Sequence, residues 1–79
     1  MRYYFNIKDG DTLLDDEGLE LDDMDAVKAE AVNSAADSIK DLENPDFWKG
    51  EAWTLWVTDQ PNGGGNTLLT LSLSARLAA

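Results

Sequence analysis

The sequence predicts a small α+β fold, in which one long helix covers one face of an antiparallel sheet. Two patterns indicate this fold. In the segment 22–43, apolar residues recur at three- and four-residue steps, the spacing of one face of an α-helix. In the segments 2–8, 51–59 and 67–74, apolar and polar residues alternate, as in strands with one buried face. The predicted order is β-β-α-β-β, in a single domain spanning residues 1–79.

The N-terminal part predicts a hairpin. The alternating segment 2–8 is followed by Asp9-Gly10, a strong signal for a tight turn between two strands. A short second strand is expected over 12–14. Residues 15–18 interrupt it and an extended path resumes over 19–21, so we expect the return arm to carry an acidic bulge or turn.

The helix is expected to begin at Asp22 and to end near residue 43. Asp22 is the best candidate for the N-cap, because its carboxylate can accept from the free N–H groups of the first turn. Asn44-Pro45 should terminate the helix, because proline cannot continue it. The residues expected on its buried face are Met24, Val27, Ala31, Val32, Ala35, Ala36, Ile39 and Leu42.

The C-terminal half predicts a second hairpin. Residues 46–50 form a connector whose two aromatic side chains should fold over an edge of the core. Strands are expected over 51–59 and 67–74, joined by a long, flexible loop over 60–66, and residues 76–79 form a tail. The sequence leaves the order of the strands open. The sheet residues expected to face the helix are Tyr3, Phe5, Ile7, Leu19, Leu21, Trp53, Leu55, Val57, Leu69, Leu71 and Leu73.

The charge and the absent residue types limit the possible functions. The chain carries 6 basic and 16 acidic residues, a net charge of −10, which repels phosphate backbones and argues against direct nucleic-acid binding. It has no cysteine and no histidine, so thiolate zinc sites, cysteine nucleophiles and the commonest general base are absent. We expect neither an enzyme nor a bound cofactor.

A membrane association is not expected either. No segment approaches the ~20 consecutive apolar residues of a membrane-spanning helix. The first residues contain no apolar run long enough for a signal peptide. We therefore expect a cytoplasmic protein.

Several short motifs follow one another in an order that resembles a known family. They are Arg2-Tyr3-Tyr4-Phe5, Asp9-Gly10-Asp11, the run Asp16 to Leu21, the helix entry at Asp25-Ala26, and Trp56-Val57-Thr58-Asp59. They resemble a family of small uncharacterised bacterial proteins of the α-proteobacterial, rhizobial type, known only as a domain of unknown function. The resemblance implies the fold and a bacterial source, and it implies no activity, cofactor or catalytic residue.

The segment between Asp9 and Asp25 contains nine carboxylates and no basic residue. Such oxygen-rich segments can bind Ca²⁺ or Mg²⁺. The EF-hand pattern requires an oxygen ligand at its fifth position, where this chain would place Leu13 or Leu19. We therefore predict no metal site and interpret the acids as a solvated turn and helix caps, with a Ca²⁺-binding module as a remaining alternative.

The aromatic residues are the strongest indication of a functional surface. Tyr4 and Trp56 lie on the faces of their strands that the helix does not cover, where Leu68 and Leu14 can join them. An uncovered apolar patch of this kind marks a surface for a partner or for a second copy. The alternative is that the connector at 46–50 covers this face. We predict a protein-interaction module, a homodimer or a binder of another protein, that acts through the open sheet face or an edge strand.

A second hypothesis depends on charge alone. An acidic patch of Asp15, Asp16, Glu17 and Glu20 could mimic nucleic acid or capture a basic protein. The ending Leu77-Ala78-Ala79 is similar to small apolar endings that bacterial proteases recognise, and we interpret it as an ordinary terminus.

Overall fold

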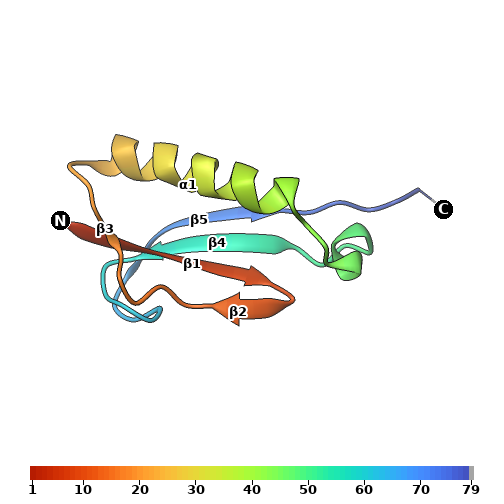
Figure 1. Ribbon diagram of the computed structural model, residues 1–79, viewed down its shortest axis with the longest axis horizontal. Coiled ribbons are helices and arrows are strands. Elements are labelled where there is room, and N and C mark those ends of the chain that lie inside the picture. The colour runs from red at the N-terminus through yellow and green to blue at the C-terminus, as the bar shows by residue number, and fades with distance from the viewer. Residues whose placement is uncertain (79) are drawn as a thin grey trace.

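A computed structural model describes residues 1–78 and consists of one antiparallel sheet with one α-helix on one of its faces (Figure 1). This confirms the predicted α+β class and, in outline, the predicted order. Ala79, part of the predicted tail, lies outside the described residues. The elements are β1 (Arg2–Asp9), β2 (Asp11–Leu13), β3 (Leu19–Glu20), α1 (Met24–Lys40), the 3-10 helix η1 (Pro45–Trp48), β4 (Trp53–Thr58) and β5 (Thr67–Leu73).

The strand order, which the sequence leaves open, is β2-β1-β4-β5, with β3 pairing on β1 beside β2. The two strands in the middle, β1 and β4, are distant in the sequence, and their register places Phe5 opposite Val57. On the other side of β4, Leu55 lies opposite Leu71 of β5. The first hairpin therefore contributes one central strand, and the second hairpin contributes the other central strand and the edge strand β5.

The N-cap of α1 lies one residue later than predicted, and the helix ends before residue 43. The N-cap is Asp23, whose Oδ1 accepts from the Ala26 N–H at 2.9 Å; the prediction of Asp22 was wrong. Asp23 has the extended backbone of a cap, with φ −156°, and lies three residues before the N–H group that it accepts from. At the other end the Leu42 N–H bonds to the Ile39 carbonyl, a tight turn that ends α1 at Lys40.

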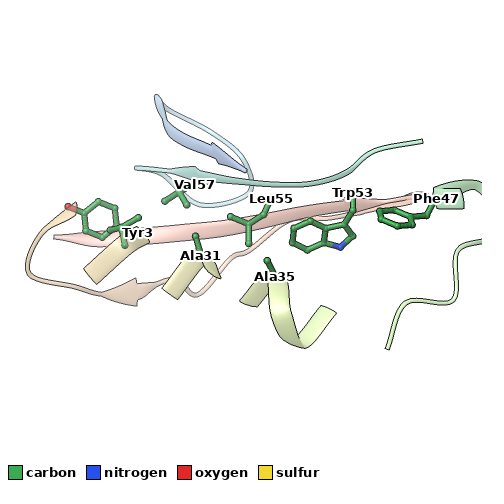
Figure 2. Close-up of a cluster of buried hydrophobic side chains, with 8 residues drawn as sticks. Tyr3, Ala31, Ala35, Phe47, Trp53, Leu55 and Val57 are labelled. Carbon is green, nitrogen blue, oxygen red and sulfur yellow. The ribbon is translucent and has the colours of Figure 1, made fainter. Parts of the chain in front are cut away.

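The core lies between α1 and the sheet (Figure 2). The sheet side is a row of large side chains that runs from Tyr3 to Phe47, and α1 contributes small residues opposite them. Alanine at two buried helix positions lets the helix backbone approach the sheet closely. The buried residues are Tyr3, Val27, Ala31, Ala35, Phe47, Trp53, Leu55 and Val57.

Five residues predicted to be inward are exposed, namely Leu19, Met24, Val32, Ala36 and Leu73. Leu19 is 43% exposed because β3 has only two residues and lies at a sheet edge. Val32 of α1 is 60% exposed and Leu73 of β5 is 36% exposed. Both lie at the β5 side of the molecule, where the sheet ends, so no strand of the described chain covers them.

The connector after α1 forms η1 and closes one end of the core. Asn44 caps η1 by accepting from the Asp46 N–H at 3.1 Å. Phe47 is buried on the helix side of the sheet, next to Trp53 (Figure 2). Trp48 packs edge-on against Phe47 with ring centroids 5.3 Å apart and is 51% exposed. The connector therefore covers a core edge, as predicted, and the alternative that it covers the open sheet face was wrong. Within residues 1–78, no helix is both long and apolar enough to cross a membrane.

Candidate protein-interaction site

The sheet face away from α1 carries two of the three residues predicted to form an interface. Because side chains alternate along a strand, Tyr4 and Trp56 lie on the face away from the core residues of their strands. Leu68 is the extra residue of a β-bulge in β5, opposite Val57 and Thr58 of β4. Trp56 occupies the centre of this face, with Asn6 of β1 on one side and Thr70 of β5 on the other. Tyr4 and Trp56 are half-buried, and Leu68 is 38% exposed. Polar neighbours thus separate the apolar side chains.

A bulge between β2 and β3 covers one end of this face. Residues 14–18 leave the strand ladder, and the carboxylate of Asp15 replaces the missing strand by accepting from the Phe5 N–H at 3.0 Å. Its other oxygen accepts from the N–H groups of Glu17 (3.0 Å) and Gly18 (3.1 Å). Burial alone would raise the pKa of Asp15, but these three hydrogen bonds hold the pKa below its ordinary value. The predicted acidic bulge is therefore an ordered structural element.

A buried amide connects this bulge with the sheet. Asn6 is fully buried, and its Nδ2 donates to the Thr58 hydroxyl and to the Trp56 carbonyl, each at 3.2 Å. Its Oδ1 accepts from the Asp15 N–H at 3.0 Å. Thr58, also fully buried, donates to the Gln60 carbonyl at 2.9 Å. Sequence reasoning missed this pair, because both residues occupy strand positions that point away from the helix.

The loop at residues 60–66, which we expected to be flexible, is held against the bulge. The Asn62 N–H donates to the Asp15 carbonyl at 2.8 Å. The Asp59 carboxylate accepts from the backbone N–H of Asn66 at 2.8 Å and from its amide at 3.1 Å, and these bonds lower the pKa of Asp59. Bulge and loop together cover the Tyr4 end of the open face.

The four acids predicted as a binding patch do not form one free surface. Asp15 is engaged in the bulge. Glu20 pairs with the N-terminal amine at 2.7 Å, which lowers the pKa of Glu20. Asp16 and Glu17 are exposed. Within residues 1–78, no three carboxylates are placed so that they could hold a metal ion together.

A second acidic surface lies at the opposite end of the molecule and was not predicted. It is a cleft of about 460 Å³ where the turn between β1 and β2 meets the end of α1. One hydrogen bond crosses it, from the Asn44 amide to Asp9 at 3.3 Å. The cleft has no cationic and no nucleophilic side chain in its lining, which consists of Asp9, Gly10, Asp11, Asp41, Glu43 and Asn44.

An apolar surface lies at the β5 edge. As the last strand in the order β2-β1-β4-β5, β5 pairs with β4 on one side only, within the part of the chain that the structure describes. An unpaired strand edge presents a row of free N–H and C=O groups, and proteins commonly protect such edges with charges, proline or short strands. β5 is seven residues long and residues 67–75 contain no charge and no proline. The opposite edge is formed by the much shorter β2 and β3.

An apolar groove lies beside this edge, between β5 and α1. It has a volume of about 330 Å³ and is lined by Val32, Ala35, Ala36, Ile39, Leu71 and Leu73. A smaller hollow of about 180 Å³ adjoins it at Val32 and Leu71, and Lys28 contributes its only charge. Sequence reasoning assigned these side chains to the core. The missed signal was the width of the apolar stripe on the helix, which exceeds what a sheet ending at β5 can cover.

Comparison with known proteins identifies the family. The family model described as Domain of unknown function (DUF6894) matches residues 2–74. The chain belongs to this family. The predicted resemblance to a domain of unknown function is thereby confirmed, whereas the bacterial source stays a prediction. Neither the curated proteins nor the solved structures contain a significant match.

The matched region of the DUF6894 domain contains every strand and both helices of the fold. It therefore includes the open face, the acidic cleft and the β5 edge with its groove. The family description states no activity, so a function for the DUF6894 domain has to be argued from these three surfaces. Of the three, only the β5 edge combines unpaired backbone groups with exposed apolar side chains.

Proposed function

We propose that this DUF6894 domain is a non-enzymatic protein-interaction module that binds through the β5 edge and the groove between β5 and α1. The observation that carries the proposal is a long, uncharged edge strand next to exposed apolar side chains, with Val32 60% and Leu73 36% exposed. An extended segment can add to such an edge through main-chain hydrogen bonds, while its side chains enter the groove.

The open sheet face is a weaker candidate for the interface than the β5 edge. Tyr4 lies against the bulge, so closely that a Cβ built on Gly18 would come within 2.8 Å of its ring. Trp56 is half-buried between polar neighbours, and its closest register partners are Asn6 and Thr70. Large contiguous apolar patches are the usual mark of an interface, and the β5 groove matches this description better.

The absence of the usual catalytic side chains also supports a binding role. The chain has no histidine and no cysteine, and the acidic cleft has no nucleophile in its lining. Capture of a basic protein by negative charge is the weaker proposal, because Asp15 and Glu20 of the expected patch already have partners within the chain.

Site-specific photo-crosslinking tests the proposal. A photoreactive amino acid is placed at position 32 in the groove or at position 72 on β5, in the organism that carries the gene. Position 33 serves as the matched control, because Asn33 is the exposed neighbour of Val32 in α1. Position 56 tests the open face.

Crosslinked products from positions 32 and 72 and none from position 33 are the expected result. The mass of each product identifies the partner. Products from position 56 alone would move the interface to the open face, and an absence of products from both 32 and 72 would contradict the proposal.

A further inference from the structure

We infer that the segment that binds the β5 edge is β5 of a second copy of the same chain, antiparallel to the first and related to it by a two-fold axis near Thr70. This inference rests on the proposed function, since it names the occupant of the same surface.

The backbone of β5 fits its own copy. In an antiparallel ladder, the N–H and C=O groups of alternate residues point to the same side of the strand, so the side of β5 away from β4 offers regularly spaced donors and acceptors over Leu69–Leu73, where the pairing with β4 is regular. Between Thr67 and Leu69 the register shifts, and Leu68 is the extra residue of a β-bulge. A two-fold axis brings the same surface of both copies together, so each donor of one strand meets the corresponding acceptor of the other. Thr70 is the middle residue of β5, and an axis there pairs the regular segment Leu69–Leu71 with the same segment of the second copy.

This register also keeps the side chains on their correct faces. With Thr70 opposite Thr70 of the second copy, Leu69 lies opposite Leu71. Leu69 and Leu71 belong to the helix side in both copies, whereas Thr70 and Ser72 belong to the open side. A shift by one residue of one strand would place leucine opposite open-face positions and is therefore disfavoured.

The grooves of the two copies meet in this arrangement. An axis perpendicular to the sheet leaves both α1 helices on the same face, one on each side of the new strand pair. Each groove lies beside the β5 edge, and Val32 and Leu73 are large apolar residues exposed in its lining. In the dimer these side chains face the same surface of the second copy, so apolar area that water contacts in the monomer becomes covered.

The charge distribution favours a second copy over a basic partner. Two chains that each carry −10 repel one another over most of their surface. The β5 strand and the groove lining contain no carboxylate, and the adjoining hollow contains only Lys28. A basic protein would be attracted to the acidic cleft near Asp9 instead. The β5 edge is therefore the surface through which like-charged copies can approach.

Light scattering over a concentration series tests the inference with a matched pair of variants. The unmodified chain should have the mass of a dimer. Val32→Asp places two like charges across the axis and should raise the dimer dissociation constant about tenfold or more. Val32 is largely exposed, so this change should leave the monomer folded, as checked by circular dichroism. Asn33→Asp adds the same charge one residue away and should leave the dimer intact.

The absence of cysteine permits a second, independent test of the register. Thr70→Cys should give rapid disulfide dimers under mild oxidation, because directly opposite residues in an antiparallel pair lie within disulfide reach. Ser72→Cys should crosslink poorly, because its counterpart in the second copy lies four residues away along the paired strand. Thr54→Cys, on the open side of the inner strand β4, is the control that should not crosslink.

A monomer at every concentration, or equal crosslinking of Thr54→Cys and Thr70→Cys, would overturn the inference. In that case photo-crosslinks from position 32 to another protein would leave the proposed function standing. An absence of any crosslink from positions 32 and 72 would remove the proposed function as well.

Discussion

At the scale of single residues, the amide of Asn6 connects segments that are distant in the sequence. Three of its hydrogen bonds reach β4 at Trp56 and Thr58 and the bulge at Asp15. Since the amide is fully buried, each of these bonds is made away from water. Removing one partner of a buried hydrogen bond leaves the other unsatisfied, which costs more than the bond itself contributes.

Asn6→Ala should therefore lower the free energy of unfolding by about 2–4 kcal/mol. The loss includes the unpaired Asp15 N–H and the space left by the amide. Ser72→Ala, an exposed polar position on the same sheet face, is the control and should change stability by less than about 0.5 kcal/mol. Urea titration followed by fluorescence measures both. Equal small effects would show that the Asn6 bonds are replaced by water.

Asp15 gives a prediction about pH. Its pKa is lowered in the folded state, so its contribution to stability is complete above the pKa of the unfolded chain and is lost as the pH falls through the folded value. Asp15→Asn should cost about 1–3 kcal/mol at neutral pH, because the amide cannot accept on both sides.

The difference in the free energy of unfolding between the original chain and Asp15→Asn should become smaller below about pH 4. Asp16→Asn changes the net charge equally at an exposed residue and is the control for long-range electrostatics. Urea titrations at several pH values give both differences. A difference for Asp15→Asn that does not change with pH would contradict the prediction.

At the scale of the elements, two neighbouring aspartates at the start of α1 have different roles, because Asp23 is the N-cap and Asp22 is not. Asp23→Ala removes the acceptor of the Ala26 N–H and should cost about 1 kcal/mol. Asp22→Ala changes the charge equally and should cost only a few tenths of a kcal/mol. Thermal unfolding followed by circular dichroism compares the two. A larger effect at Asp22 would restore the cap predicted from the sequence.

Local patterns predicted the elements well because periodicity is a property of short segments. The alternation around Trp53, Leu55 and Val57 predicted their buried face correctly. The N-cap was misplaced by one residue because Asp22 and Asp23 are chemically equivalent caps, and only the backbone conformation distinguishes them.

Features that depend on distant segments could not be predicted in this way. The strand order requires β1 to pair with β4, and no short segment contains this information. Burial of Asn6 depends on a bulge and a loop that meet only in the folded chain. The exposure of Val32, and with it the groove, depends on where the sheet ends. The sequence predicted an interface on the open sheet face or at an edge strand and named Tyr4, Trp56 and Leu68 for it. It did not identify the groove between β5 and α1.

At the scale of the whole molecule, the net charge of −10 opposes the compact state. The structure describes four ion pairs among residues 1–78, and all of them involve exposed side chains. Exposed pairs of this kind contribute little to stability. Self-repulsion is therefore largely uncompensated.

Salt should consequently stabilise this protein. Raising the salt concentration to about 1 M shortens the screening length to ~3 Å and should raise the melting temperature by about 4–8 °C, equivalent to ~1 kcal/mol for a domain of this size. Thermal scans at constant protein concentration measure the shift. Sodium chloride is the suitable salt, because sulfate also strengthens apolar burial. A melting temperature that falls with salt would show that attractive pairs dominate.

The pairing of β1 with β4 has a consequence for synthesis on the ribosome. β1 is made first, yet its central neighbour follows roughly 40 residues later, which at ~5–20 residues per second means a delay of roughly 2–9 s. During this time the nascent chain carries Tyr3, Phe5 and Ile7 without the strand and the core that cover them. A ribosome that stalls before Trp53 therefore leaves an N-terminal fragment with exposed apolar side chains. Such a fragment is prone to aggregate unless chaperones bind it or proteases degrade it.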